Sequence, residues 1–99
     1  MATKDFAQHL RQDQRLVLLR LLSEMVSYRS NSSVLSNLMH QMGHTMTRDQ
    51  VKTELSWLAE QGLLTLEEAG SVIVATLDER GQDVAEGRGR VDGVNRPRA

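Results

Sequence analysis

The sequence of 99 residues contains no cysteine, a single proline and only three aromatic side chains. Without cysteine, disulfide bonds, thiolate catalysis and cysteine-built metal sites are excluded. The scarcity of aromatics means that the core must be built mainly from leucine, valine and methionine. No apolar run approaches the ~20 residues that a membrane-spanning helix needs, so we expect no membrane partner. The first residues lack the apolar stretch of a secretory signal, and we therefore expect a cytoplasmic protein.

Charge is distributed unevenly along the chain, although the net charge is only -1. Residues 1–86 carry eight basic and twelve acidic side chains, whereas residues 87–99 carry four arginines and one aspartate. The last segment also has three glycines and cannot bury enough apolar surface to offset its loss of entropy on ordering. We therefore divide the chain into a domain at 1–86 and a basic, flexible tail at 87–99, disordered or draped over the domain.

Apolar spacing predicts three helices in the first two thirds of the chain. The first covers about residues 5–28, the second about residues 33–42 and the third residues 47–61. Gly43 and Gly62 stand where left-handed C-terminal caps belong, and they end the second and third helices. Thr47 and Gln50 have the spacing of a capping box, which fixes the start of the third helix.

After Gly62 the hydrophobic period changes from helical to alternating. Residues 63–66 and the β-branched residues 71–76 predict two strands joined by a turn at 67–70, so a β-hairpin is expected. Glu67 and Glu68 would then lie at its tip. A second capping box beginning at Thr76 predicts a final helix that runs to about residue 86. The predicted fold class is α+β, mostly α, with a three-helix core, a hairpin and a C-terminal helix.

This order of elements resembles the winged helix-turn-helix domain, with the hairpin as the wing and residues 47–61 as the recognition helix. The stretches 31–33, 43–44, 47–51, 55–63, 76–88 and 94–97 are similar to those of small proteins of Mu-like transposable phages and prophages, which are grouped with ArsR-type winged-helix regulators. The resemblance covers about residues 10–98. It implies a DNA-binding domain inside a bacterial host cell. ArsR-type metal sensing normally uses cysteine, so the resemblance does not carry that activity here.

Helix-turn-helix proteins present the early residues of the recognition helix to DNA. Arginine and glutamine can read base edges, while lysine and threonine hold phosphates. The predicted DNA-binding residues of the third helix are Arg48, Gln50, Lys52 and Thr53. The predicted DNA-binding residues of the tail, which could act as a basic arm, are Arg88, Arg90, Arg96 and Arg98. The alternative is an ordinary solvated helix face, and the acidic hairpin turn counts against strong binding.

The first helix is apolar over more of its circumference than one small core requires. Leu16 and Leu19 widen this stripe, and we expect them, with Val84, to form a homodimer interface. The resemblance implies the same pairing, because ArsR-like proteins associate through their first and last helices. The alternative is a monomer whose extra leucines lie under the tail.

Two classes of function follow. The first is a dimeric phage regulator or DNA-transaction accessory that binds double-stranded DNA. The second is a winged helix used as a protein-interaction module that docks onto a phage or host protein. No nucleophile–base motif, phosphate loop or cofactor fingerprint is present, so neither an enzyme nor a cofactor is expected. His40 and His44 are four residues apart, but Gly43 between them ends the helix, and we expect no metal site.

Overall fold

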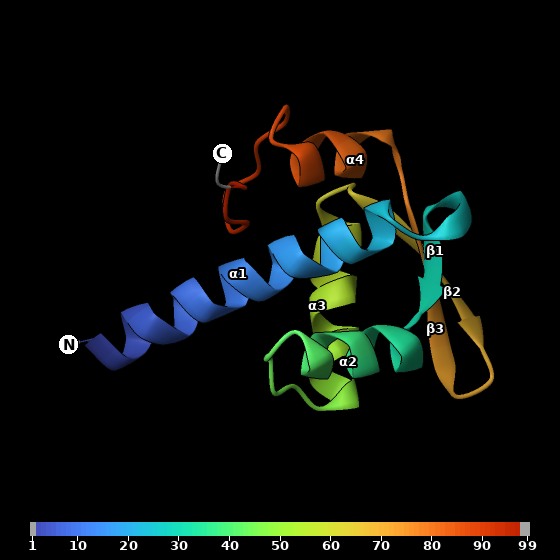
Figure 1. The fold of residues 1–99 in the computed structure, drawn as a ribbon, viewed down its shortest axis with the longest axis horizontal. Helices are drawn as coiled ribbons and strands as arrows, with labels where there is room; N and C mark the ends of the chain where they lie inside the picture. Colours follow the sequence, from blue (N-terminus) through green and yellow to red (C-terminus); the bar gives the residue numbers. More distant parts are fainter. Residues whose placement is uncertain (1, 98–99) are drawn as a thin grey trace.

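Four helices and three short strands make up the structure, a computed structural model that describes residues 2–97 (Figure 1). The fold is α+β and mostly helical, as the sequence predicts. The elements, in chain order, are α1 (Ala2–Ser23), the short 3₁₀ helix η1 (Val26–Tyr28), β1 (Arg29–Asn31), α2 (Ser32–Gln41), α3 (Arg48–Glu60), β2 (Leu64–Ala69), β3 (Val72–Leu77) and α4 (Glu79–Glu86).

The long helix α1 is the element around which the others assemble. It packs against α2, α3, α4 and β3, and Figure 1 shows it crossing in front of α3. Its inward residues Leu18, Leu19 and Leu22 are completely buried. The other fully buried large apolar side chains are Leu35, Met39, Val51, Leu55, Leu58 and Leu63. The core is therefore aliphatic, as the composition predicts.

α1 ends five residues earlier than the sequence predicts. It stops at Ser23, and the chain then turns through η1, where Ser27 and Tyr28 both have a φ of 57°. Met25, between α1 and η1, is already extended at φ -83° and ψ 153°, so the α-helical conformation is broken before the left-handed residues are reached. No helix among the described residues, α1 included, is long and apolar enough to cross a membrane.

The two central helices follow the prediction closely. The side chain of Asn31 caps α2 by accepting a hydrogen bond from the Val34 N–H at 2.9 Å. After α2, Gly43 adopts a φ of +89°, and the His44 N–H donates to the carbonyl of Met39. Local hydrogen bonds thereby satisfy backbone groups at both ends of α2. The chain then reverses direction and enters α3 after six residues.

The predicted hairpin is confirmed, but its first strand is longer than predicted and its second strand is shifted by one residue. β2 and β3 pair antiparallel from Leu64–Leu77 to Ala69–Val72, so the tip is formed by Gly70 and Ser71. Glu67 and Glu68 belong to β2, and the prediction that they form the turn is wrong. β1, which the sequence analysis missed, adds to the other edge of β3 in the order β1-β3-β2.

β1 escaped prediction because its three residues are polar and are held by tertiary pairing. Arg29, Ser30 and Asn31 pair with Thr76, Ala75 and Val74. Ser32, the next residue, is buried, and its hydroxyl accepts a hydrogen bond from the Ile73 N–H at 3.0 Å. Strands are predicted from alternating apolar residues, and a strand of three polar residues has no such pattern.

The N-terminal cap of α4 is also corrected. Asp78, not Thr76, caps the helix, and its carboxylate accepts from the Gly81 N–H at 3.0 Å. Thr76 remains within β3 because its backbone pairs with β1 and β2. The strand therefore extends by pairing into the residues that resembled a capping box.

The three residues predicted to form a dimer interface are buried within a single chain. Leu16 is 6%, Leu19 0% and Val84 3% exposed. They belong to the same buried cluster as Val91 and Val94 of the C-terminal segment. The predicted dimer interface is wrong in these residues, because side chains that the protein's own core already covers cannot contact a partner.

The segment 88–97 is draped along α1, which was one of the two descriptions that the sequence left open. Val91 and Val94 are both buried, at 8% exposure. The Asn95 N–H donates to the Gln12 carbonyl at 3.2 Å, and its side-chain amide donates to Asp13 Oδ1 at 3.1 Å. The domain therefore continues past residue 86, and the tail contributes to the core.

Replacing Gly81 with alanine is expected to destabilise the fold, although alanine is favoured over glycine in helices by about 1 kcal/mol. An added Cβ would lie 2.1 Å from the carbonyl oxygen of Leu63 and 2.5 Å from Leu77 Cδ1. Because that oxygen is backbone, α4 must shift, and overpacking of this kind typically costs about 1–3 kcal/mol. Because the overlap with a backbone atom is severe, we take the upper half of that range, about 2–3 kcal/mol, and after the gain in helix propensity we expect a net loss of about 1–2 kcal/mol in the free energy of unfolding, measured by urea denaturation.

Gln82→Ala, the next position in α4, is the matched control and should change stability by less than about 0.5 kcal/mol. An unchanged unfolding midpoint for Gly81→Ala would show that α4 does not pack this closely on Leu63 and Leu77.

Candidate nucleic-acid interface

The exposed helix α3 begins at the capping box that the sequence predicts. The Gln50 N–H donates to the Thr47 hydroxyl at 3.0 Å, and the Thr47 N–H donates to Gln50 Oε1 at 2.8 Å. These two bonds satisfy backbone donors that the first helical turn would otherwise leave free. They fix the first residue of α3, and therefore which side chains face outward.

The buried side of α3 is set by three apolar residues and one glutamate. Val51, Leu55 and Leu58 are completely buried, and Glu54 is 7% exposed. At about 100° per residue, the opposite side of the helix is then centred on an exposed stripe. The exposed residues of that stripe are Asp49, Thr53, Ser56 and Glu60. The outermost line of α3 is therefore polar with two carboxylates.

The four predicted contact residues of α3 divide into two free and two engaged side chains. Arg48 and Thr53 are exposed. Gln50 uses its side-chain oxygen in the capping box, so only its amide N–H groups remain for another partner. Lys52 is half-buried, and its ammonium donates to the carbonyl of Ser71 at 2.9 Å. This bond joins α3 to the tip of the β2–β3 hairpin.

The hairpin presents a neutral tip beside Lys52. Gly70 has a φ of +62°, which permits the tight turn, and Ser71 follows it. Glu67 lies back along β2, where its carboxylate is 3.4 Å from the Arg29 guanidinium. Both side chains of that ion pair are largely exposed, so it contributes little to stability. The charge repulsion expected from an acidic tip is correspondingly reduced, although Glu68 stays exposed nearby on β2.

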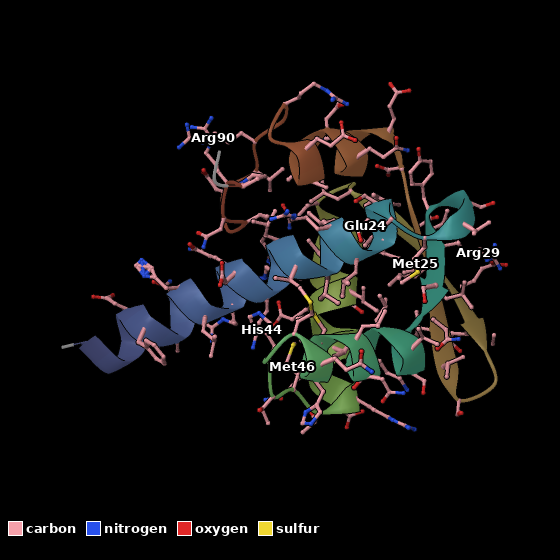
Figure 2. The ribbon with its side chains drawn as sticks, viewed as in Figure 1. Glu24, Met25, Arg29, His44, Met46 and Arg90 are labelled. Carbon is pink, nitrogen blue, oxygen red and sulfur yellow. The ribbon has the colours of Figure 1, made fainter. Side chains whose placement is uncertain are left out.

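The stretch from Met25 to Arg48, which includes β1 and α2, contains no aspartate or glutamate. It carries two arginines, Arg29 and Arg48, and two histidines, His40 and His44. A polar cavity of about 360 Å³ lies at the α2–α3 connection. It is lined by Ser36, Asn37, His40, Gln41 and Met46. Figure 2 places His44 and Met46 on this connection, beside α1. This surface offers hydrogen-bond donors and no carboxylate.

The tail arginines are not equivalent. Arg88 is 3.0 Å from Asp83 and also contacts Glu86, and the hydrogen bonds to these carboxylates raise the pKa of its guanidinium. Its charge is thus locally neutralised. Arg90 and Arg96 are exposed, and Figure 2 shows Arg90 at the periphery. Arg98 lies outside the described residues. Of the four predicted tail contacts, Arg90 and Arg96 are placed to reach a partner.

A buried ion pair, which the sequence analysis missed, orients α3. Arg15 Nε lies 2.6 Å from Glu54 Oε1, and the two side chains are only 13% and 9% exposed. The same guanidinium stacks 3.8 Å from the centroid of the Trp57 ring. Its Nη1 donates to the Gly93 carbonyl at 3.0 Å. One side chain of α1 therefore binds α3 twice and the tail once.

Gly93 is required at its position by both conformation and space. Its φ is +96°, and an added Cβ would lie 2.7 Å from the Trp57 ring. The one signal in the sequence for this cluster is a charge within an otherwise apolar helical stripe on each helix, at Arg15 and at Glu54. Such charges are buried only when they are paired. The pairing itself depends on the packing of α1 on α3, which no local pattern encodes.

Among the described side chains, no three histidines, cysteines, aspartates or glutamates come together as metal ligands. The surface around α3 carries polar and basic side chains together with the carboxylates of Asp49 and Glu60. A mostly helical α+β domain that exposes one capped helix beside a hairpin is the class of protein that these observations define.

Comparison with known proteins places the chain in a phage family. It is 48% identical over 89 residues to the uncharacterized protein gp26 of Escherichia phage Mu, which covers 90% of this chain and 92% of gp26. It is 46% identical over 76 residues to an uncharacterized protein of Haemophilus influenzae, covering 76% of this chain and 74% of that protein. No protein-family model matches the chain. The chain belongs to the family of phage Mu gp26, and the predicted relation to Mu-like phage proteins is confirmed.

Removing the charge of Glu54 by Glu54→Gln is expected to lower the free energy of unfolding by about 2 kcal/mol, since the Arg15 charge then loses its partner in a mostly buried site. Urea denaturation measures the change. Glu60→Gln removes the same charge from an exposed position on α3 and should change stability by less than about 0.5 kcal/mol. Equal effects of the two substitutions would contradict the clamping role of the Arg15–Glu54 pair.

Proposed function

We propose that this protein is a winged-helix domain that binds double-stranded DNA through α3, the α2–α3 connection and the tip of the β2–β3 hairpin. In this proposal α3 is the recognition helix and the hairpin is the wing. The protein would act in the phage as a regulator or as an accessory in a DNA transaction. The observation that carries the proposal is the hydrogen bond from Lys52 to Ser71, which brings a basic residue of α3 to the tip of the hairpin.

The arrangement supports contacts of two kinds. Arg48 and Thr53 are free on the early part of α3, the part that helix-turn-helix proteins place in the major groove. Lys52 stands beside the hairpin tip, where a wing approaches the phosphate backbone. The absence of carboxylates from Met25 to Arg48 leaves the adjoining α2 surface free of repulsion toward phosphate. Base contacts and backbone contacts are thus offered by neighbouring elements.

The charges on this surface also limit the affinity. Asp49 and Glu60 lie on the exposed stripe of α3, whereas Lys52 is the basic residue of α3 that contacts the hairpin tip. Affinity for DNA rises with the number of phosphates neutralised, so one such surface binds modestly and with a shallow salt dependence. Arg90 and Arg96 line a hollow of the tail beside Gln12 of α1, and from there they would add a separate contact.

The same exposed carboxylates favour a second candidate function. Asp49 and Glu60 on the recognition face suit a basic protein surface better than a phosphate backbone. In that case the winged helix would dock onto a phage or host protein. Binding to a random-sequence duplex at low salt distinguishes the two functions, since a protein-docking surface of this charge would leave DNA unbound.

Substituting both Arg48 and Lys52 with alanine is expected to weaken binding to duplex DNA by about 10-fold or more, and to lower the salt slope by about two. Fluorescence anisotropy of a labelled random-sequence duplex across a salt series measures both quantities. The physical reason is the loss of two cations from the face that meets the phosphates.

Arg80→Ala, which removes an exposed arginine of α4, serves as the control beside the single Arg48→Ala variant. If the two single variants lose affinity equally, binding depends on overall charge and the assignment of α3 fails.

A further inference from the structure

The outer side of α1 carries a stripe of four apolar residues, of which Val17 and Leu21 are half-buried and pack against the edge of the core. At about 100° per residue, Phe6, Leu10, Val17 and Leu21 fall within about 60° of one another around the helix. Phe6 is 68% exposed and Leu10 is 40% exposed. Leu18, Leu19 and Leu22, on the inward side, are fully buried. α1 is therefore apolar on two sides, and its own chain covers one of them well.

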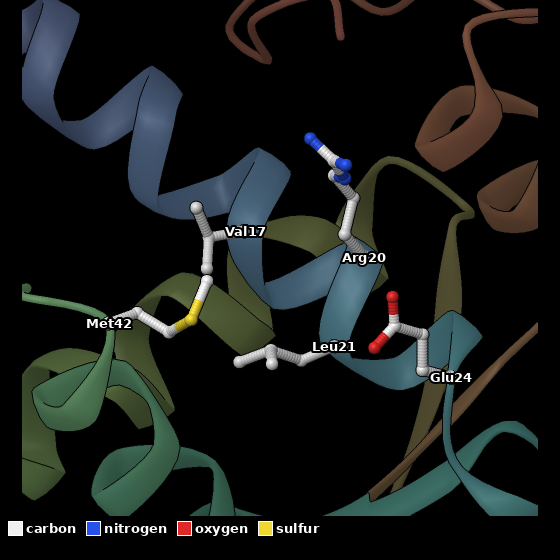
Figure 3. Close-up of a pocket in the computed structure, with 5 residues that line it drawn as sticks. All are labelled: Val17, Arg20, Leu21, Glu24 and Met42. Atoms are coloured by element: carbon white, nitrogen blue, oxygen red, sulfur yellow. The ribbon is translucent and has the colours of Figure 1, made fainter.

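The two halves of this stripe differ in their surroundings. Figure 1 shows the first half of α1 extending beyond the rest of the molecule, so Phe6 lies on a projecting arm. The second half borders a cavity of about 150 Å³ between α1 and the end of α2. Val17, Leu21 and Met42 converge on this cavity, with Arg20 and Glu24 completing its lining (Figure 3). Met42 is itself 58% exposed.

The cavity has the size of an aromatic ring. An engineered apolar cavity of about 150 Å³ in another protein binds benzene, which is the ring of a phenylalanine side chain. The cavity here has an apolar wall, and the chain carries an exposed phenylalanine on the same helix. The distance along α1 from Phe6 to Leu21 is about 22 Å, so the ring of one chain cannot fill its own cavity.

We infer that this surface is the interface with a second copy of the chain, in which the two α1 helices pair antiparallel and Phe6 of each copy enters the cavity of the other. The positions are self-complementary. Phe6 and Leu21 are equally far from the midpoint between Asp13 and Gln14, and so are Leu10 and Val17. A two-fold axis through this midpoint therefore places Phe6 against Leu21 and Leu10 against Val17 in both copies, as an isologous dimer requires.

We choose the antiparallel arrangement because it covers apolar surface that a parallel pair of α1 helices would leave exposed. A parallel pair would set Phe6 against Phe6 and leave both cavities open. The antiparallel pair covers both projecting arms and both cavities.

One contact opposes the dimer. Asp13 is exposed beside the two-fold axis, so the two Asp13 carboxylates approach each other. Added salt screens this repulsion and strengthens apolar association, so the dimer should tighten as salt concentration rises. This interface does not involve Leu16, Leu19 or Val84. Its formation is measured without DNA, so the test of the dimer is independent of the test of the proposed function.

Phe6→Glu is expected to weaken the dimer about 100-fold or more, because two aromatic side chains per dimer lose their burial and two charges enter apolar cavities. Analytical ultracentrifugation of the full chain measures the dissociation constant. Val26→Glu is the matched control, since Val26 is apolar and 90% exposed but lies outside the stripe. Phe6 is exposed in the single chain, so its replacement leaves the fold intact, which circular dichroism checks.

A wild-type chain that stays monomeric at high micromolar concentration overturns the inference. So does an equal loss of dimer with Phe6→Glu and Val26→Glu, or a dimer that dissociates as salt is added.

The register is tested by crosslinking, which the absence of native cysteine makes direct. Leu10→Cys protein mixed with Val17→Cys protein should crosslink through a short bis-maleimide, whereas each protein alone should crosslink poorly. A parallel dimer gives the reverse result, with efficient crosslinking of each variant to itself, and would overturn the antiparallel arrangement.

Discussion

The ion pair between Arg15 and Glu54 is the contact on which the orientation of α3 depends. Because both side chains are almost buried, each charge is tolerated only in the presence of the other. The Arg15 guanidinium also stacks on Trp57 and binds the Gly93 carbonyl, so a single group joins α1, α3 and the tail. An ion pair of this kind adds little net stability over an apolar contact, but it permits only one relative placement of the two helices.

Local signals account for the features that the sequence predicted correctly. The capping box at Thr47 and the left-handed Gly43 and Gly62 depend on neighbours within a few residues, and the structure contains all three. The features that prediction missed depend on distant partners. β1 exists because β3 pairs with it, and β3 extends through Thr76 for the same reason. The Arg15–Glu54 pair joins residues 39 apart and has no local pattern.

The predicted interface residues of α1 are buried in the core. They show why the sequence alone could not separate the apolar residues of α1 that the core uses from those that stay exposed. Leu16 and Leu19 widened the stripe and indicated a partner, but Val91 and Val94 of the tail join them in the core. The sequence predicts a basic and flexible tail because the two valines of the tail are dispersed among glycines and arginines. With that side of α1 covered internally, the opposite side, from Phe6 to Leu21, is what remains for a second chain. The helix that organises the core thus also presents the proposed interface between copies.

The proposed function places DNA on the face formed by α3, the α2–α3 connection and the hairpin tip. Titration of the isotopically labelled protein with a duplex, followed by amide chemical shifts in NMR spectra, tests this most directly. The account predicts shifts concentrated at Arg48, Lys52, Thr53 and Ser71 that diminish as salt is added. Shifts that cluster along Phe6 to Leu21, or none at low salt, would contradict it.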